Sequence, residues 1–272
     1  MNTLARLKRC ASLIACTTAL PLMITAAPSH AVAVFDQGFE TDTAGMIGNF
    51  NRTASGTDGL TSFEGGFHAV ATGGYDDNND YQYAYTRFDG YRDSFPGDYS
   101  ASVAIFLDTS WAAGSGFDYS VASNGTDGNH QRDFIFHVTQ DSSSGQLLVG
   151  GNNNSNFAPI ENLEAGNHFV VENSGWYLFE HLFRNDGGLL AVDLNLYSSV
   201  GDLLFTETRT SAADTIPGDV GGNRYGWFTD ISVEGGLAVD AFSLNLPAPV
   251  PEPASLALVG LALLAASRFR KH

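Results

Sequence analysis

Short apolar stretches separated by polar turns run through the middle of the chain. Alternation of apolar and polar residues predominates there, and no stretch repeats apolar residues at helical spacing for more than two turns. This pattern predicts strands punctuated by turns rich in glycine, asparagine and aspartate. The predicted strands span residues 66–71, 81–88, 100–108, 118–122, 133–140, 146–150, 168–172, 176–184, 189–197, 203–208, 226–231 and 237–246.

Two of these strands are predicted to bury different faces. In 190–196, leucine and valine side chains share one face and polar residues occupy the other, which predicts a strand with one dry face. Residues 176–183 are apolar on both faces and predict a central strand covered on both sides. About a dozen strands within residues 34–246 indicate an all-β domain, either a two-sheet sandwich or a barrel.

The first 33 residues have the pattern of a secretory signal peptide. Three basic residues precede an apolar stretch over 11–27, and small residues then alternate up to Ala31 and Ala33. Cleavage after Ala31 or after Ala33 fits the small-residue rule, and both sites stay open. Lipid attachment at Cys16 is an alternative, although fewer apolar residues precede this cysteine than a signal peptide normally contains.

The chain ends with a short apolar run and a basic tail. The run over 254–267 has 14 residues, so as a helix rising about 1.5 Å per residue it would span roughly 21 Å. This is less than the ~30 Å thickness of a hydrocarbon core. A permanent anchor would require local thinning of the bilayer, and Arg268, Arg270 and Lys271 would hold the C-terminus on the cytoplasmic side.

The last 23 residues resemble a known sorting signal. Pro251, Glu252 and Pro253 are followed by the apolar run and the basic tail, in the order found in the PEP-CTERM sorting domain of Gram-negative bacteria. The resemblance implies export by the general secretion machinery, a transient hold in the inner membrane by the C-terminal helix, and processing by an exosortase. It further implies a cell-surface or extracellular location, as in the matrix of a biofilm. An ordinary C-terminal anchor on a proline-rich stalk is the alternative.

The chain therefore divides into four predicted parts. They are a signal peptide over 1–33, a β domain over 34–246, a linker with the Pro-Glu-Pro motif over 247–253, and a hydrophobic helix with its basic tail over 254–272.

Strand order in the second half of the β domain resembles the concanavalin-like and laminin-G-like jelly roll. The resemblance implies that the first and last strands pair, so residues 34–39 are expected beside residues 237–246. The expected fold is an all-β, two-sheet antiparallel jelly-roll sandwich, flanked by the signal peptide and the short C-terminal hydrophobic helix.

The predicted β domain is strongly acidic and contains no cysteine. Its 29 acidic residues face only seven arginines and no lysine, a net charge near −22. Nucleic acids and anionic lipid surfaces are disfavoured partners, since binding a polyanion requires a basic surface. Because Cys10 and Cys16 both lie in the leader, the domain contains no disulfide and depends on core burial for its stability.

Alternating oxygen-bearing residues suggest a calcium site. Asp76, Asn78 and Asp80 follow the ligand alternation that opens a calcium-binding loop. The EF-hand pattern then fails, because Tyr81 stands at its glycine position and Arg87 at its closing glutamate. Calcium is therefore a possible cofactor, and the alternative is a solvated turn whose side chains hydrogen-bond to their own backbone.

A row of tyrosines suggests a sugar-binding surface. Tyr81, Tyr83 and Tyr85 alternate along a predicted strand, share one face, and are followed on that face by Arg87. Flat aromatic rings beside polar groups suit carbohydrate, for example an exopolysaccharide. Cross-strand packing between sheets is the alternative.

Catalytic motifs are not found in the sequence. The five histidines of the predicted β domain lack metal-ligand spacing, and His137 and His181 are expected to be hydrogen-bonded and half-buried. No strand carries the carboxylate pair of a retaining glycosidase, and no nucleophile elbow, P-loop or zincin helix is present. We therefore expect a non-catalytic module that binds polysaccharide or envelope components. The alternative is a glycosidase or lyase on the same fold, with an active site that no motif reveals.

Overall fold

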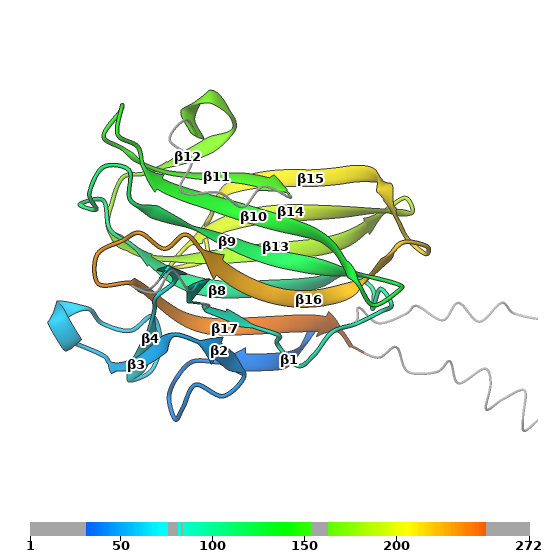
Figure 1. Ribbon diagram of the computed structural model, residues 1–272, viewed down its shortest axis with the longest axis horizontal. Coiled ribbons are helices and arrows are strands. Elements are labelled where there is room, and N and C mark those ends of the chain that lie inside the picture. Colours follow the sequence, from blue (N-terminus) through cyan, green and yellow to red (C-terminus); the bar gives the residue numbers. More distant parts are fainter. Residues whose placement is uncertain (1–30, 76–80, 83, 154–162, 249–272) are drawn as a thin grey trace, which may run out of the picture.

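Two antiparallel sheets packed face to face form the body of the protein (Figure 1). The computed structural model describes residues 31–75, 81–82, 84–153 and 163–248. The larger sheet contains, in spatial order, β15 (Leu203–Thr215), β14 (Leu189–Ser198), β13 (Gly175–Asp186), β8 (Tyr99–Leu107), β17 (Leu237–Pro247), β4 (Phe67–Ala71) and β3 (Phe50–Ala54), with β1 (Ala31–Gln37) also paired to β17.

The smaller sheet has seven strands. They are, in spatial order, β12 (His168–Val171), β11 (Leu147–Asn153), β10 (His130–Gln140), β9 (Gly116–Gly125), β16 (Val220–Thr229), β7 (Ala84–Thr86) and β2 (Met46–Gly48). A separate two-stranded ribbon pairs β5 (Gly74–Tyr75) with β6 (Tyr81–Gln82), and two short 3-10 turns are η1 (Thr57–Gly59) and η2 (Leu163–Ala165).

Alternating side chains from the two sheets build one aromatic core. In β14 the predicted dry face is confirmed, since its leucine and valine side chains are all buried. Across the core, Phe179 of β13 meets Phe136 of β10 edge to face, with ring centroids 4.9 Å apart. Burying a ring of this size stabilises the fold by about 1.5–3 kcal/mol, which is how a domain without disulfides holds two sheets together.

The first and last strands pair as predicted. Phe35 of β1 lies opposite Leu244 of β17, and Ala31 lies opposite Pro247. The two chain ends therefore leave the sandwich side by side at one end, on the right in Figure 1.

Two sequence predictions are corrected by the structure, and two strands were missed. The predicted strand over 81–88 is divided into β6 and β7, while β2 was not predicted because it is short and β3 because it is mostly exposed. β13 is central in its sheet, but its outward residues Leu178 and Leu182 are only half-buried, so no third layer of described residues covers that face. The predicted hydrophobic helix over 254–272 lies outside the described residues, and among those that are described no helix is long and apolar enough to cross a membrane.

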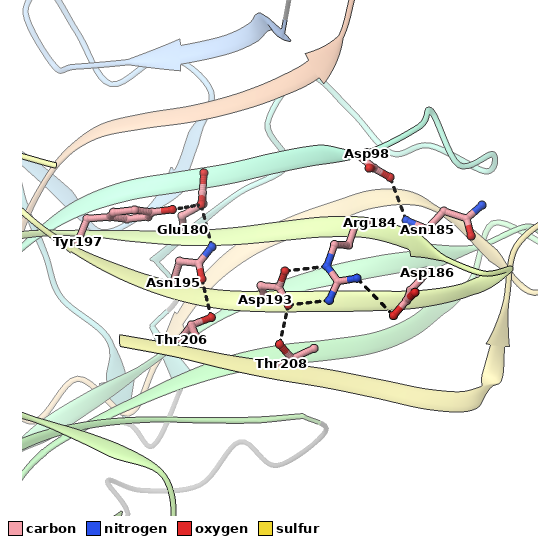
Figure 2. A network of polar contacts seen from close by, with 10 residues as sticks. All are labelled: Asp98, Glu180, Arg184, Asn185, Asp186, Asp193, Asn195, Tyr197, Thr206 and Thr208. Carbon is pink, nitrogen blue, oxygen red and sulfur yellow. Dashed lines mark hydrogen bonds and ion pairs between the residues drawn. The ribbon is translucent and has the colours of Figure 1, made fainter. Parts of the chain in front are cut away.

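Polar side chains on the outer face of the larger sheet bond to one another (Figure 2). Asp193 accepts hydrogen bonds from Arg184 Nε and from the Thr208 hydroxyl, each at 2.7 Å. Glu180 accepts from Asn195 at 3.1 Å and from the Tyr197 hydroxyl at 3.0 Å. Because these groups already satisfy one another, a ligand gains little by displacing them.

Replacing Gly116 should destabilise the sandwich without touching any surface site. A Cβ at Gly116, the first residue of β9, would overlap the backbone carbonyl oxygen of Val138 in β10. We expect Gly116→Ala to cost about 1–3 kcal/mol, measured by urea unfolding. Gly175→Ala is the matched control, because Gly175 also begins a strand and its added methyl group would meet no atom within 4 Å. Equal stability of the two variants would contradict the prediction.

Candidate functional site

The outer face of the smaller sheet carries neighbouring aromatic side chains. Alternation along β16 directs Phe228 into the core and leaves Tyr225 and Trp227 half-buried on the outer face. In the adjacent strand β7, Tyr85 lies directly opposite Trp227. Opposed residues in antiparallel strands have Cβ atoms about 4.5–5.5 Å apart, so Tyr85 and Trp227 lie side by side.

A glycine between the two aromatic residues of β16 lets this strand approach the core. A Cβ at Gly226 would lie 3.0 Å from the Phe88 ring and 3.1 Å from the Tyr119 hydroxyl. A larger residue would push β16 outward and change the positions of Tyr225 and Trp227 together.

A small cavity lies between these rings and the segment that follows β7. It has a volume of about 220 Å³ and is lined by Tyr85, Arg87, Tyr91, Tyr225 and Trp227, which we call the aromatic pocket. Tyr91 is 40% exposed, which leaves the pocket open to solvent. Pockets for drug-sized ligands measure roughly 300–1,000 Å³, so this one suits a single sugar ring within a longer chain.

Polar contacts fix the position of Tyr225 at the edge of the pocket. Its hydroxyl donates a hydrogen bond to Asp133 at 3.1 Å, and His130 stacks on its ring with centroids 6.0 Å apart. His130 Nε2 also lies 2.9 Å from the second carboxylate oxygen of Asp133. Burial, together with the charge of Asp133, raises the pKa of Tyr225, so the hydroxyl stays a hydrogen-bond donor at every physiological pH.

The aromatic pocket has the chemistry of a carbohydrate site. Tyr and Trp rings offer apolar faces with a polar edge, and sugar rings present C–H groups on one face with hydroxyls around the rim. Arg87 supplies hydrogen-bond donors at the edge of the same cavity. A small number of polar groups among aromatic walls is the usual composition of an oriented binding site.

A buried histidine and aspartate form a second cluster on the same sheet. His137 of β10 lies opposite Asp118 of β9, and His137 Nδ1 is 2.6 Å from Asp118 Oδ1. His137 Nε2 has no partner among the described residues. The predicted hydrogen bonds are present, but His137 and His181 are fully buried rather than half-buried. His181 points into the core between the sheets, and His137 lies in a part of β10 that is enclosed on both faces. His137 also lines a cavity of about 410 Å³ with residues that include Gly150 and Asn167.

The predicted tyrosine row is interrupted in the structure. Tyr85 and Arg87 both line the aromatic pocket. Tyr81 lies in β6, opposite Tyr75, and Tyr83 is outside the described residues. The break between β6 and β7 therefore separates Tyr85 from the rest of the row.

The structure does not describe the predicted calcium ligands. Asp76, Asn78 and Asp80 lie outside the described residues. Within the part of the chain that is described, no three histidine, cysteine, aspartate or glutamate side chains cluster closely enough to hold a metal ion. Calcium binding stays a prediction.

The predicted signal-cleavage residues lie in the first strand of the larger sheet. Ala31 and Ala33 belong to β1, opposite Pro247 and Asn245 of β17, and cleavage after either residue stays a prediction. The predicted sorting residues outside the described region are Pro251, Glu252, Pro253, Arg268, Arg270 and Lys271.

Sequence reasoning missed three of the five residues of the aromatic pocket. Tyr91, Tyr225 and Trp227 were not singled out, although Tyr225 and Trp227 flank a glycine at the start of a predicted strand. Two aromatic residues separated by one glycine were the available signal.

Comparison with known proteins bears first on the C-terminal tail. Residues 249–271 match the model of the PEP-CTERM protein-sorting motif. The chain carries a sorting signal. The PEP-CTERM motif implies an exported, surface-attached protein that an exosortase processes. Of the curated proteins compared by sequence, none matches the chain.

Solved structures with a similar arrangement of strands are β-sandwiches. An endo-1,3-beta-glucanase from Streptomyces sioyaensis is 13% identical, with 83% of this chain and 100% of that chain covered and a TM-score of 0.47. Lectin I from Ulex europaeus, solved with the methyl glycoside of alpha-L-fucose, is 12% identical, with 79% and 97% covered and a TM-score of 0.41. The predicted all-β fold of two antiparallel sheets is confirmed by the strand order of this structure.

The expectation of a non-catalytic domain is corrected by the same comparison. The similar structures include a glucanase as well as lectins. Neither the fold nor the absence of a known motif shows that the protein lacks an enzymatic activity. The prediction that it is not an enzyme is therefore wrong.

Proposed function

We propose that the exported sandwich binds a polysaccharide of the cell surface or extracellular matrix through the aromatic pocket. The observation that carries the proposal is the pairing of Tyr85 with Trp227 on an outward face, beside Tyr91 and two arginines. A sugar ring stacked on these residues would leave its hydroxyls free to bond with Arg87 and with the Tyr225 edge. Exosortase sorting of the tail would deliver the pocket to the place where exopolysaccharide accumulates.

Retention on immobilised polysaccharides tests this function. The purified protein should bind at least one member of a panel of bacterial exopolysaccharides, and Tyr85→Ala should weaken that binding. Tyr197→Phe is a matched control, because Tyr197 lies on the outer face of the opposite sheet and only its hydroxyl contact to Glu180 is lost. Failure to bind any polysaccharide, or equal binding by Tyr85→Ala, contradicts the proposal.

A second candidate function is abstraction of a proton from a bound glycan by His137. With Nδ1–H donated to Asp118, the unpartnered Nε2 is the ring nitrogen that can accept a proton. Ser120 and Asp118 lie on the same face of β9, where Ser120 is opposite Trp227 and Asp118 is opposite His137. A polysaccharide bound at the aromatic pocket would therefore extend across this face toward His137. This pair would be the active site that no sequence motif reveals.

Product analysis tests the second function. If it holds, incubation with a retained polysaccharide releases reducing ends or unsaturated ends, and His137→Gln abolishes release while leaving retention intact. Retention without any release, by the wild-type protein on every polysaccharide that it binds, rules out this candidate and leaves the binding function standing.

A further inference from the structure

Arginines in this acidic sandwich are mostly neutralised by carboxylates. Of the seven arginines in residues 34–246, four form ion pairs within the described residues, and Arg52 instead donates to the backbone carbonyls of Phe39 and Glu40. The four pairs are Arg92 with Asp89, Arg132 with Asp214, Arg184 with Asp193, and Arg209 with Glu207.

The two remaining arginines both lie near the ring of Tyr91, which lines the aromatic pocket together with Arg87. The Arg87 guanidinium carbon lies 5.4 Å from the centroid of the Tyr91 ring, and that of Arg224 lies 4.6 Å from the same centroid. Neither forms an ion pair with a described carboxylate. Arg224 Nη1 donates to Asn124 at 2.6 Å, while its Nε is buried and has no partner.

Two carboxylates that share a neighbour with Arg224 have other partners. Asp133 accepts from Tyr225 and contacts His130, and Asp93 accepts from Asn124 at 2.7 Å. Two guanidinium groups near one ring, neither in an ion pair with a described carboxylate, bring positive charge to this place. In a domain of net charge near −22, a local excess of positive charge beside a sugar-sized cavity favours an anionic ligand group.

We propose that the glycan bound at the aromatic pocket carries a carboxylate, as in a uronic acid residue, and that Arg87 and Arg224 bind this group. The proposal rests on the proposed binding function. Guanidinium groups form paired, charge-assisted hydrogen bonds with a carboxylate, while the uronate ring stacks on Trp227 and Tyr85. The negative field of the rest of the domain opposes a densely charged chain, so the fitting polysaccharide bears uronate residues spaced among neutral sugars.

Chemically paired probes test the assignment. An oligosaccharide from a glucuronate-containing exopolysaccharide is compared with the same oligosaccharide after reduction of its carboxyl groups, and with a version sulfated in place of the carboxylate. The wild-type protein should bind the uronate probe about tenfold or more tighter than the reduced probe, as expected for hydrogen bonds to a charged group. The Arg87→Gln/Arg224→Gln variant should lose this preference and keep the weaker binding of the reduced probe.

The outcomes distinguish failure of the carboxylate assignment from failure of glycan binding itself. Arg184→Gln, which removes an arginine on the outer face of the opposite sheet, should retain the preference. If the wild-type protein binds the uronate and reduced probes equally, the ligand group is not a carboxylate, and glycan binding is unaffected by that result. If it binds the sulfated probe more tightly than the uronate probe, the ligand group is a sulfate ester and not a uronate. Absence of binding to all three probes and to the polysaccharide panel overturns the proposed function itself.

Discussion

Trp227→Ala is expected to weaken glycan binding about 30-fold or more. Trp227 lies at the centre of the aromatic pocket, opposite Tyr85 and with its ring 5.9 Å from that of Tyr225. Truncating a central aromatic residue of a binding site typically costs about 2 kcal/mol or more, which corresponds to about 30-fold in the dissociation constant. Isothermal titration with the tightest-binding oligosaccharide of the panel measures this loss.

A matched tryptophan on the other sheet separates binding from folding. Trp176 of β13 lies at the opposite outer face, where its ring contacts Phe106 and its indole N–H donates to the Thr61 carbonyl at 2.7 Å. Trp176→Phe should bind the oligosaccharide as the wild-type protein does. If Trp227→Ala retains full affinity while its unfolding transition is unchanged, the ligand binds somewhere other than the aromatic pocket.

Period-two alternation predicted most of the fold because the core dictates it. In β14, for example, leucine and valine occupy alternate positions along the buried face. β2 was missed because three residues are too short to establish a period, and β3 because it is mostly exposed and polar after Phe50. The extra length of β15 was also missed, since its second half is polar and mostly exposed and therefore lacks the apolar signal.

The candidate site was only half predictable, because it depends on long-range register. Tyr85 and Arg87 were recognised from local alternation, and they do line the pocket. Their partner Trp227 is far away in sequence, and its place opposite Tyr85 follows from the order β9, β16, β7 in the sheet. A one-residue change of register would have moved every aromatic ring to the other face, and local patterns do not define that register.

The net charge of the domain did not reveal the two arginines beside the aromatic pocket. A net charge near −22 argues correctly against nucleic acid as a partner. It says nothing about where the seven arginines lie, and only the folded chain places Arg87 and Arg224 over one tyrosine ring. The net charge of the domain therefore argues against whole classes of partner, such as nucleic acids. The residues that line the pocket determine which ligand group binds there.

Acidification is expected to destabilise the sandwich through His181. This side chain of β13 is completely buried between the sheets, with Tyr119 and Phe136 packed edge-on against it. Its Nε2–H donates to the Phe134 carbonyl of the opposite sheet at 3.1 Å. Burial lowers the pKa of His181 to about 3, and the hydrogen bond to Phe134 offsets only part of this effect.

The direction of the pH effect follows from where the proton binds. The unfolded chain takes up a proton at His181 below a pKa of about 6.5, whereas the folded chain does not until about pH 3. The free energy of unfolding is therefore unaffected above pH 6.5 and falls by about 1.4 kcal/mol per pH unit below it, or about 2 kcal/mol between pH 7 and pH 5. Asp240 acts in the opposite direction between about pH 6 and 4, because burial raises its pKa to about 6 and the folded state then binds the proton more tightly.

Variants isolate the histidine from the opposing aspartate. His181→Gln keeps a donor for the Phe134 carbonyl and cannot titrate, so its unfolding free energy, measured in urea at pH 7, 6 and 5, should fall by about 2 kcal/mol less than that of the wild-type protein. His168→Gln is the control, since His168 is part-exposed in edge strand β12 and bonds only to the Gly166 carbonyl. It should keep the wild-type pH dependence. Parallel pH profiles for wild type and His181→Gln would mean that the folded state accommodates the imidazolium, against the burial on which the expectation rests.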